Sequence, residues 1–526
     1  MKKECSSHPF SSRCRGCPLS RRDFLGVAGA ACAGLAASAF LPQQGQAAAP
    51  GAPKMKLRLV FALHAPVQPA PDWPNKGYDF RPFMQKVEQI LQRRCRDMQF
   101  LTSTATGPEQ AAKILEEDKT TGVQGYVVFQ MNCWNRVVQT VAGAGKPTLY
   151  ADFQYGGSGG FLVYNAAFLR ANTPNVGFVA SSDMEDLVAA VECFRLVQQG
   201  GTVADFVAAT AQVRQRSMPR VGRLASREDR MNLLAVDECV RRMRQSKILA
   251  VRDPSAGAEG TCMEIPVQRI SFAELNEAWK NANKDEARVL AYRWSKGAAR
   301  VAGVDWSTLE ASAAMYLAQK EVMKRHQANA ITINCLGGFY GGHIHAYPCL
   351  GFHELLNEGL IGACECDIRS TATMVAFTTL TQGRPGYISD PVMDTAKGQI
   401  IYAHCVASNR PFGPQGRANA YQILTHSEDR QGASVRSLLP AGYVVTTLEV
   451  DNGRKEILLH RARTVGNDPD DRACRTKLCA VPMGDFEKLF TFWDQWGWHR
   501  VTFYGDLREP AYELAKAIGW KVVEEA

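Results

Sequence analysis

Two carboxylates in the second half of the chain each follow a short apolar segment: Glu365 follows 360–364, and Asp390 follows 385–389. Side chains at strand ends are held rigidly and face a cleft, which suits metal ligands and catalytic bases. A histidine, His499, stands directly before a further strand-like segment near the end of the chain. The alternative is that both carboxylates lie on surface turns and that the histidine has a structural role.

Two carboxylates and one imidazole form a suitable ligand set for a hard or borderline divalent ion such as Mn²⁺. Such a set leaves positions on the ion open for two oxygens of a substrate. We therefore expect Glu365, Asp390 and His499 to be metal ligands, with a divalent metal, Mn²⁺, as the cofactor.

Aromatic and histidine side chains elsewhere have two readings each. Trp496 and Trp498, just before His499, could stack on a sugar face, and burial in the core is an equal alternative. For His426, a position in a surface turn is at least as good an interpretation as a role in the metal site. A structural role is favoured for a group of histidines near a glycine-rich stretch, because no acidic partner is obvious; this group comprises His343, His345 and His353.

Strand-like apolar segments alternate with helical spacing through the first two thirds of the mature chain, which predicts parallel sheets covered by helices on both faces. No Gly-x-Gly-x-x-Gly follows the first strand, so a dinucleotide site is not supported there. The glycine-rich run 156–160 predicts a flexible loop, or else a loop that approaches a ligand. The expected strands are 56–63, 125–131, 147–153, 246–251, 265–270 and 330–334, and the expected helices are 83–94, 272–281 (with Ser271 as N-cap) and 311–324.

The last third of the chain reads differently, because strands dominate it. Asp-Asn-Gly at 451–453 joins two strand-like segments, 444–450 and 455–459, and Asn-Gly is a strong hairpin signal. A final strand and helix follow at 500–504 and 510–518.

The expected fold class is therefore α/β, with two Rossmann/flavodoxin-like parallel-sheet domains followed by a mainly β C-terminal domain. About 477 residues are too many for one core, which supports several domains. We place the N-terminal α/β domain at 54–243, the second α/β domain at 244–380, and the C-terminal mainly β domain, which would complete the metal site, at 381–526.

The first 49 residues have the features of a Tat signal peptide. Two arginines, Arg21 and Arg22, precede an apolar run of roughly 15 residues, which is shorter than the ~20 residues of a membrane-spanning helix. An alanine-rich end, 47–49, suits a signal peptidase. We expect transport by the Tat translocase and a periplasmic or secreted location.

Charge and cysteine content set further bounds. Residues 1–49 hold six Lys/Arg and two Asp/Glu, so the formal charge falls from +9 to +5 in the mature chain, and no basic run interleaved with aromatics supports nucleic-acid binding. Twelve of the 16 cysteines lie in the mature part. In an exported protein Cys474 and Cys479 are the best local candidates for a disulfide, although buried free cysteines are the commoner case.

Three motifs together resemble the fucose isomerase and arabinose isomerase superfamily, and more closely its fucose isomerase-like members. They are Glu-Cys-Asp at 365–367, Tyr-Ile-Ser-Asp at 387–390 and Trp-Gly-Trp-His-Arg-Val-Thr at 496–502. The strand, turn and helix at 267–279 extend the resemblance over most of 244–526. The segment between Asp390 and His499 is much shorter than in fucose isomerase, and the family's sugar isomerases work in the cytoplasm.

The resemblance implies an aldose–ketose isomerase that acts on a small-molecule sugar through an enediol. Glu365 and Asp390 would be both catalytic residues and metal ligands, with His499 as the third ligand. His404 resembles a second histidine in the metal region of arabinose isomerases, and with Trp496 and Trp498 it would contact the substrate. It also implies a homo-oligomer, in which the first domain of a neighbouring copy would close the pocket. An exported, non-catalytic sugar-binding protein of the same fold and an epimerase are the alternatives.

Overall fold

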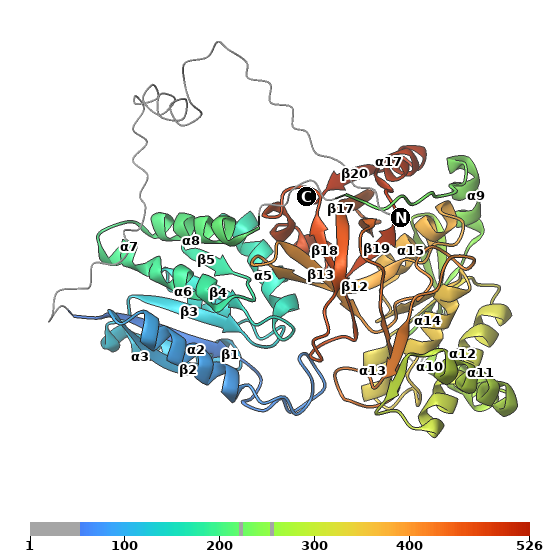
Figure 1. The fold of residues 1–526 in the computed structure, drawn as a ribbon, viewed down its shortest axis with the longest axis horizontal. Coiled ribbons are helices and arrows are strands. Elements are labelled where there is room, and N and C mark those ends of the chain that lie inside the picture. Colours follow the sequence, from blue (N-terminus) through green and yellow to red (C-terminus); the bar gives the residue numbers. More distant parts are fainter. Residues whose placement is uncertain (1–52, 220–224, 253–256) are drawn as a thin grey trace, which may run out of the picture. The chain divides into compact units, whose positions relative to one another are not determined.

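A computed structural model describes residues 53–219, 225–252 and 257–526 (Figure 1). The predicted signal peptide, 1–49, lies outside the described residues. Within the described part of the chain, no helix has the length and apolar character needed to cross a membrane.

The first sheet is entirely parallel, with strand order β2-β1-β3-β4-β5. This is the order of a flavodoxin-like sheet, and helices cover both of its faces (Figure 1). The central strands are buried along their whole length, as expected of a parallel sheet covered on both sides. The elements are β1 (Met55–Ala62), α2 (Arg81–Arg94), β2 (Met98–Ala105), α3 (Pro108–Thr121), β3 (Gly125–Gln130), α4 (Val137–Ala142), β4 (Thr148–Asp152), α5 (Ser158–Arg170), β5 (Val176–Val179), α6 (Met184–Glu192), α7 (Phe194–Gln198) and α8 (Val203–Ser217).

The second sheet has strand order β11-β10-β6-β8-β7 and is parallel except for β7. Ser271 caps α10 as predicted, because its hydroxyl accepts a hydrogen bond from the backbone N–H of Glu274 at 3.2 Å. The elements are α9 (Val236–Gln245), β6 (Ile248–Val251), β7 (Gly257–Cys262), β8 (Ile265–Ile270), α10 (Phe272–Lys280), α11 (Lys284–Gly297), β9 (Arg300–Ala302), α12 (Trp306–Arg325), β10 (Ala330–Ile333), α13 (Cys335–Tyr340), α14 (Cys349–Asn357), β11 (Ile361–Cys364) and α15 (Ile368–Leu380).

The third region is mainly β. Its large sheet runs β16-β19-β12-β13-β18-β17-β20, and β16 also pairs with β17, so the sheet closes into a barrel with β20 attached outside the ring. The predicted hairpin is the pair β16–β17, which is antiparallel from Val444 to Asp451. The elements are β12 (Tyr387–Asp394), β13 (Gln399–His404), β14 (Tyr421–Leu424), β15 (Ser434–Ser437), β16 (Val444–Asp451), β17 (Glu456–Asn467), β18 (Thr476–Pro482), η1 (Lys488–Phe490), α16 (Trp493–Trp496), β19 (Arg500–Tyr504), α17 (Arg508–Ala517) and β20 (Lys521–Glu524).

The fold class is therefore α/β as expected, with parallel-sheet domains followed by a β-rich C-terminal domain. One element spans a boundary placed from the sequence, and one strand pairs across the other boundary. Helix α9 spans 243/244 and packs against α15 and α17, and β9 from the second region pairs with β14 of the third. Cys474 and Cys479 are both buried free cysteines, so the disulfide considered for them is not formed.

The glycine run 156–160 is not a flexible loop, and that prediction is wrong. Helix α5 begins within it, at Ser158, and the glycines are buried. A Cβ at Gly157 would lie 1.8 Å from the carbonyl oxygen of Gln130, and one at Gly159 would lie 2.6 Å from the ring of Trp498. Glycine is needed here because the helix start lies directly against a strand end and an indole ring.

A buried ion network ties the chain end to the region before β19. Arg500 donates to Glu525 at 2.8 Å and, through Nη1, to the backbone oxygens of Gly497 and His499. His460 contacts the same carboxylate at 2.8 Å. Burial raises the pKa of Glu525, but Arg500 and His460 outweigh burial and bring it to about 2. The Glu525 side chain therefore orders, through Arg500, the turn that carries His499.

We expect Glu525→Gln to lower the free energy of unfolding by about 3–5 kcal/mol, because the substitution leaves a buried guanidinium without its counter-charge. The stabilisation should be present above the ordinary glutamate pKa of ~4.3 and be lost as the pH falls toward 2. Thermal unfolding followed by circular dichroism at pH 7 and at pH 3 measures both effects. Glu524→Gln is the control, since its partly exposed pair with Arg508 is screened by solvent and contributes little to stability. Equal midpoints for the two variants at pH 7 would contradict this account.

Candidate metal centre

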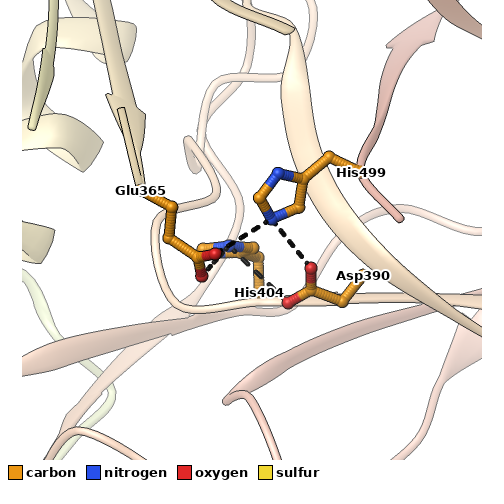
Figure 2. Close-up of side chains that lie close together, drawn as sticks. All are labelled: Glu365, Asp390, His404 and His499. Atoms are coloured by element: carbon orange, nitrogen blue, oxygen red, sulfur yellow. Dashed lines mark ion pairs between the residues drawn. The ribbon is translucent and has the colours of Figure 1, made fainter. Parts of the chain in front are cut away.

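Four side chains from separate parts of the chain converge at one end of the barrel (Figure 2). They are Glu365 after β11, Asp390 in β12, His404 at the end of β13, and His499 directly before β19. Each offers one ligand atom, and these atoms all lie within 4.8 Å of one another. The three residues expected from the sequence are thus brought together, and His404 joins them.

The distances show a cluster that faces one common point. The Nε2 atom of His499 lies 2.9 Å from Asp390 Oδ1 and 3.5 Å from Glu365 Oε2. The Nε2 atom of His404 lies 3.7 Å from Asp390 Oδ2 and 3.8 Å from Glu365 Oε1. Asp390 and His404 are buried, whereas the Glu365 side chain is 35% exposed. Glu365 is therefore the member of the cluster that a substrate can reach.

Strand pairing explains the convergence. In the barrel, Asp390 is opposite Ala403 of β13, and its neighbour Ser389 is opposite Arg500 of β19. Continued by one residue, the pairing with β19 sets His499 opposite Asp390, on the same face of the sheet. His404 follows Ala403 at the end of β13, where its ring lies beside the same carboxylate. A shift of one residue would turn the side chains to the other face.

Glu365 enters the cluster from a strained turn. Its φ is 62° and that of Cys366 is 54°, so two successive non-glycine residues adopt the left-handed conformation. The backbone N–H of Cys366 donates to the oxygen of Ile333 at 3.0 Å, which holds the turn. Strain of this kind is concentrated at functional sites, where it positions a side chain.

The donor atoms fit a divalent ion. Oδ1 of Asp390, Nε2 of His499 and both ring nitrogens of His404 are buried, and none of them makes a well-aligned hydrogen bond with a described residue, although the first two lie 2.9 Å apart. Buried polar atoms normally have partners, since desolvation without one is costly. Two carboxylates and two imidazoles are suitable ligands for Mn²⁺ or a similar ion, and all four could hold it.

The electrostatics of the cluster agree with a cation site. Burial lowers the pKa of His499, but Asp390 and Glu365 raise it more, so it lies well above the usual range. Burial also raises the pKa of Glu365, and the charge of Asp390 adds to this while His499 opposes it. The carboxylates therefore attract a positive charge at His499, and a divalent ion would compete with a proton for the same place.

Asp367 orients His499, a role that the sequence reading did not assign. Its Oδ2 lies 2.9 Å from His499 Nδ1, while Oδ1 accepts the backbone N–H of Ser370 as the N-cap of α15. The pKa of Asp367 is lowered: burial alone would raise it, but the contact with His499 and the cap bond outweigh burial. A hydrogen bond at Nδ1 leaves the lone pair of Nε2 facing the cluster. The signal in the sequence was an aspartate directly before a helix.

We expect Asp367→Asn to weaken Mn²⁺ binding by roughly 10–100-fold, because loss of a carboxylate partner frees the ring and makes it a poorer ligand. Calorimetric titration of the metal-depleted protein with Mn²⁺ gives the affinity. Asp305→Asn makes the same change at the N-cap of α12, away from the cluster, and should leave the affinity unchanged. Equal affinities for the two variants would show that Asp367 does not support the site.

The tryptophans expected near the substrate have other partners. Trp496 is buried, and the guanidinium of Arg454 covers its ring at 4.2 Å. The Trp498 ring packs on the α5 start at Gly159 and against Trp73, with centroids 5.1 Å apart. The contacts of both rings agree with the alternative, packing against other parts of the protein. Stacking of a sugar on these rings stays a prediction.

Other histidines lie outside the cluster. His426 is buried, so its assignment to a surface turn is wrong; its ring packs on Tyr347, and burial lowers its pKa. His343 stacks on Phe272, in agreement with a structural role. The other two histidines of the group near the glycine-rich stretch are His345, which lies beside Trp279, and His353, which contacts the backbone oxygen of Ala407 at 2.7 Å.

No family model matches this sequence. Sulfoquinovose isomerase from Alkalicoccus urumqiensis is 26% identical over 141 residues, which are 27% of this chain and 31% of that protein. Part of this chain is similar to a sugar isomerase. The enzyme of the same name from Priestia megaterium (strain ATCC 12872 / QMB1551) is 26% identical over 89 residues, 17% of this chain and 20% of that protein.

These matches span about a third or less of the relatives' own length, so they bear on part of the chain alone. They agree with the resemblance to sugar isomerases found in the sequence motifs, and with nothing more specific. Among solved structures, the XylFII-LytSN complex matches at 11% identity over 56% of this chain and 86% of that chain. Its TM-score is 0.15, and it carries no argument about this protein.

Proposed function

We propose that this protein is a metal-dependent aldose–ketose isomerase that acts on a sugar through an enediol. The observation that carries the proposal is the cluster of Glu365, Asp390, His404 and His499, whose ligand atoms lie within 4.8 Å of one another. The similarity to sulfoquinovose isomerases supports a sugar substrate. The resemblance to the fucose and arabinose isomerases assigns the same four residues to the metal region.

Interconversion of an aldose and a ketose moves one proton between C2 and C1 and another between the two oxygens. The carbon step needs a base beside the C–H bond, and the oxygen step needs an acid beside the carbonyl. Glu365 is the exposed carboxylate of the cluster and serves as the base that removes the C2 proton and returns it at C1. Asp390, on the buried side, acts as the acid beside the carbonyl oxygen. A bound divalent ion would supply polarisation of the carbonyl group.

The direct test is to incubate the purified mature protein, with and without Mn²⁺, with a panel of aldoses in D₂O and to record NMR spectra. We expect a ketose formed only with metal, with deuterium at C1 in the fraction of turnovers in which protonated Glu365 exchanges with D₂O before it returns the proton. Metal binding without conversion of any aldose would overturn the proposal in favour of the sugar-binding alternative. A C2 epimer as the sole product would replace isomerisation by epimerisation.

We also propose export through the Tat pathway and a periplasmic or secreted location, which rest on the arginine pair at 21 and 22 and the apolar run after it. Fractionation of cells with and without the Tat translocase tests this: retention of the precursor only in cells without it is expected, and unchanged export would rule it out. A homo-oligomer remains a proposal, to be measured by analytical ultracentrifugation.

A further inference from the structure

A small pocket lies beside the metal cluster. Glu365 and His404 form part of its wall, and much of the rest comes from α13, the region around Cys349 and the loop 425–431. Cys364, Cys405 and Cys474 complete it. Among the described residues, no lysine or arginine lines this pocket.

The loop that carries Glu428 is firmly held. The backbone N–H of His426 donates to Gln431 at 2.7 Å, which closes the turn. Arg430 ties the loop to Asp471 at 2.8 Å and to Asn75 of the first region at 2.7 Å. These contacts come from the same chain, and they hold the backbone of the loop from which the Glu428 side chain extends.

The carboxyl group of Glu428 has spare hydrogen-bonding capacity. The hydroxyl of Tyr340 donates to Oε2 at 3.2 Å. Within the described ranges, no donor reaches Oε1 and no lysine or arginine forms an ion pair with this side chain. Burial raises the pKa of Glu428 well above its usual value, and the charges of Glu365 and Asp72 raise it further. In either protonation state, Glu428 therefore offers a hydrogen-bond acceptor and no positive charge.

We propose that Glu428 binds a hydroxyl group of the substrate and determines specificity against sugars that carry an anionic group at that position. A sugar hydroxyl can donate to Oε1, whereas a sulfonate or carboxylate would be buried there without a counter-charge. The inference rests on the proposed function. It separates this protein from its relatives named for sulfoquinovose, a sulfonated sugar, because a sulfonate would find no cationic partner on these walls.

The first experiment compares sugars that differ only at C6, with the Mn²⁺-loaded wild-type protein. Glucose and galactose are paired with their uronic acids, and glucose also with sulfoquinovose. We expect kcat/KM for neutral sugars to exceed that for the acids by at least about 100-fold. Preference for an acid would overturn the inference and leave the isomerase proposal standing. Conversion of no sugar, neutral or acidic, would overturn the isomerase proposal itself and the inference with it.

The second experiment uses Glu428→Gln, which keeps the shape and removes the carboxylate. KM for neutral sugars should rise by about tenfold or more with kcat little changed, and discrimination against acids should fall by about tenfold. Mn²⁺ affinity, measured by calorimetry, should stay as in the wild type. Glu321→Gln, on the exposed side of α12, is the control. Unchanged KM and discrimination in Glu428→Gln would overturn the assignment.

Tyr340→Phe provides an independent variant in case the first is unstable. Its hydroxyl is the described donor to Glu428, so its loss should raise KM for neutral sugars in the same direction and by less, with kcat retained. A fall in kcat at constant KM would place Tyr340 in the chemical step and contradict a role in positioning Glu428.

Discussion

Replacing Glu365 by glutamine should reduce kcat for isomerisation by roughly 10²–10⁴-fold, the range that general acid–base catalysis contributes. Glutamine has nearly the same shape, but it cannot take a proton from carbon. It also places one negative charge fewer beside the metal, so Mn²⁺ binding should weaken. Turnover at saturating Mn²⁺, on the sugar that the wild type converts best, separates the loss of the base from the loss of the metal.

Glu321→Gln serves as the matched control, because it makes the same chemical change on an exposed helix face. It should retain full turnover and full Mn²⁺ affinity. Wild-type turnover in Glu365→Gln would show that another group removes the proton, even if the metal site itself is as described.

His499→Ala and His404→Ala should each weaken Mn²⁺ binding by more than the roughly 10–100-fold expected for a residue that only orients a ligand. Both imidazoles have a buried ring nitrogen that faces the carboxylates and makes no well-aligned hydrogen bond with a described residue. Neither moves a proton in the proposed reaction, so excess Mn²⁺ should restore part of the turnover. Titration calorimetry and the dependence of turnover on Mn²⁺ measure the two effects.

His345→Ala, which removes an exposed imidazole beside Trp279, is the control and should bind Mn²⁺ like the wild type. Wild-type affinity in His404→Ala would remove this residue from the ligand set and leave the three ligands expected from sequence. Wild-type affinity in His499→Ala would contradict the site as a whole.

Much of the fold could be predicted because the signals are local. The buried strands β1, β3 and β4 are rich in apolar residues, and the Asp-Asn-Gly turn marks the β16–β17 hairpin. Glu365, Asp390 and His499 could be proposed because each follows or precedes an apolar segment. The expected strand end at Asp390 is wrong, because Asp390 lies within β12. The three residues lie far apart in the sequence, so no local pattern shows that they are in contact. The expectation that they converge came from the order of the three motifs, which resembles that of the fucose and arabinose isomerases.

The rest depends on tertiary structure. His404 joins the cluster because β13 ends beside Asp390 of β12, a pairing that no local pattern specifies. The burial of His426 depends on the ring of Tyr347 above it. The glycines at 157 and 159 read as a loop in sequence, but the backbone of Gln130 and the ring of Trp498 require them. These contacts join segments that lie far apart in the chain, so the sequence does not reveal them.

Anomalous diffraction from Mn²⁺-soaked crystals tests the central claim most directly. We predict one strong peak among Glu365, Asp390, His404 and His499, with ligand atoms ~2–2.5 Å from it. The peak should disappear in crystals of His499→Ala. A fully soaked crystal with no peak in this cluster, or with its peak held by other residues, would contradict the account.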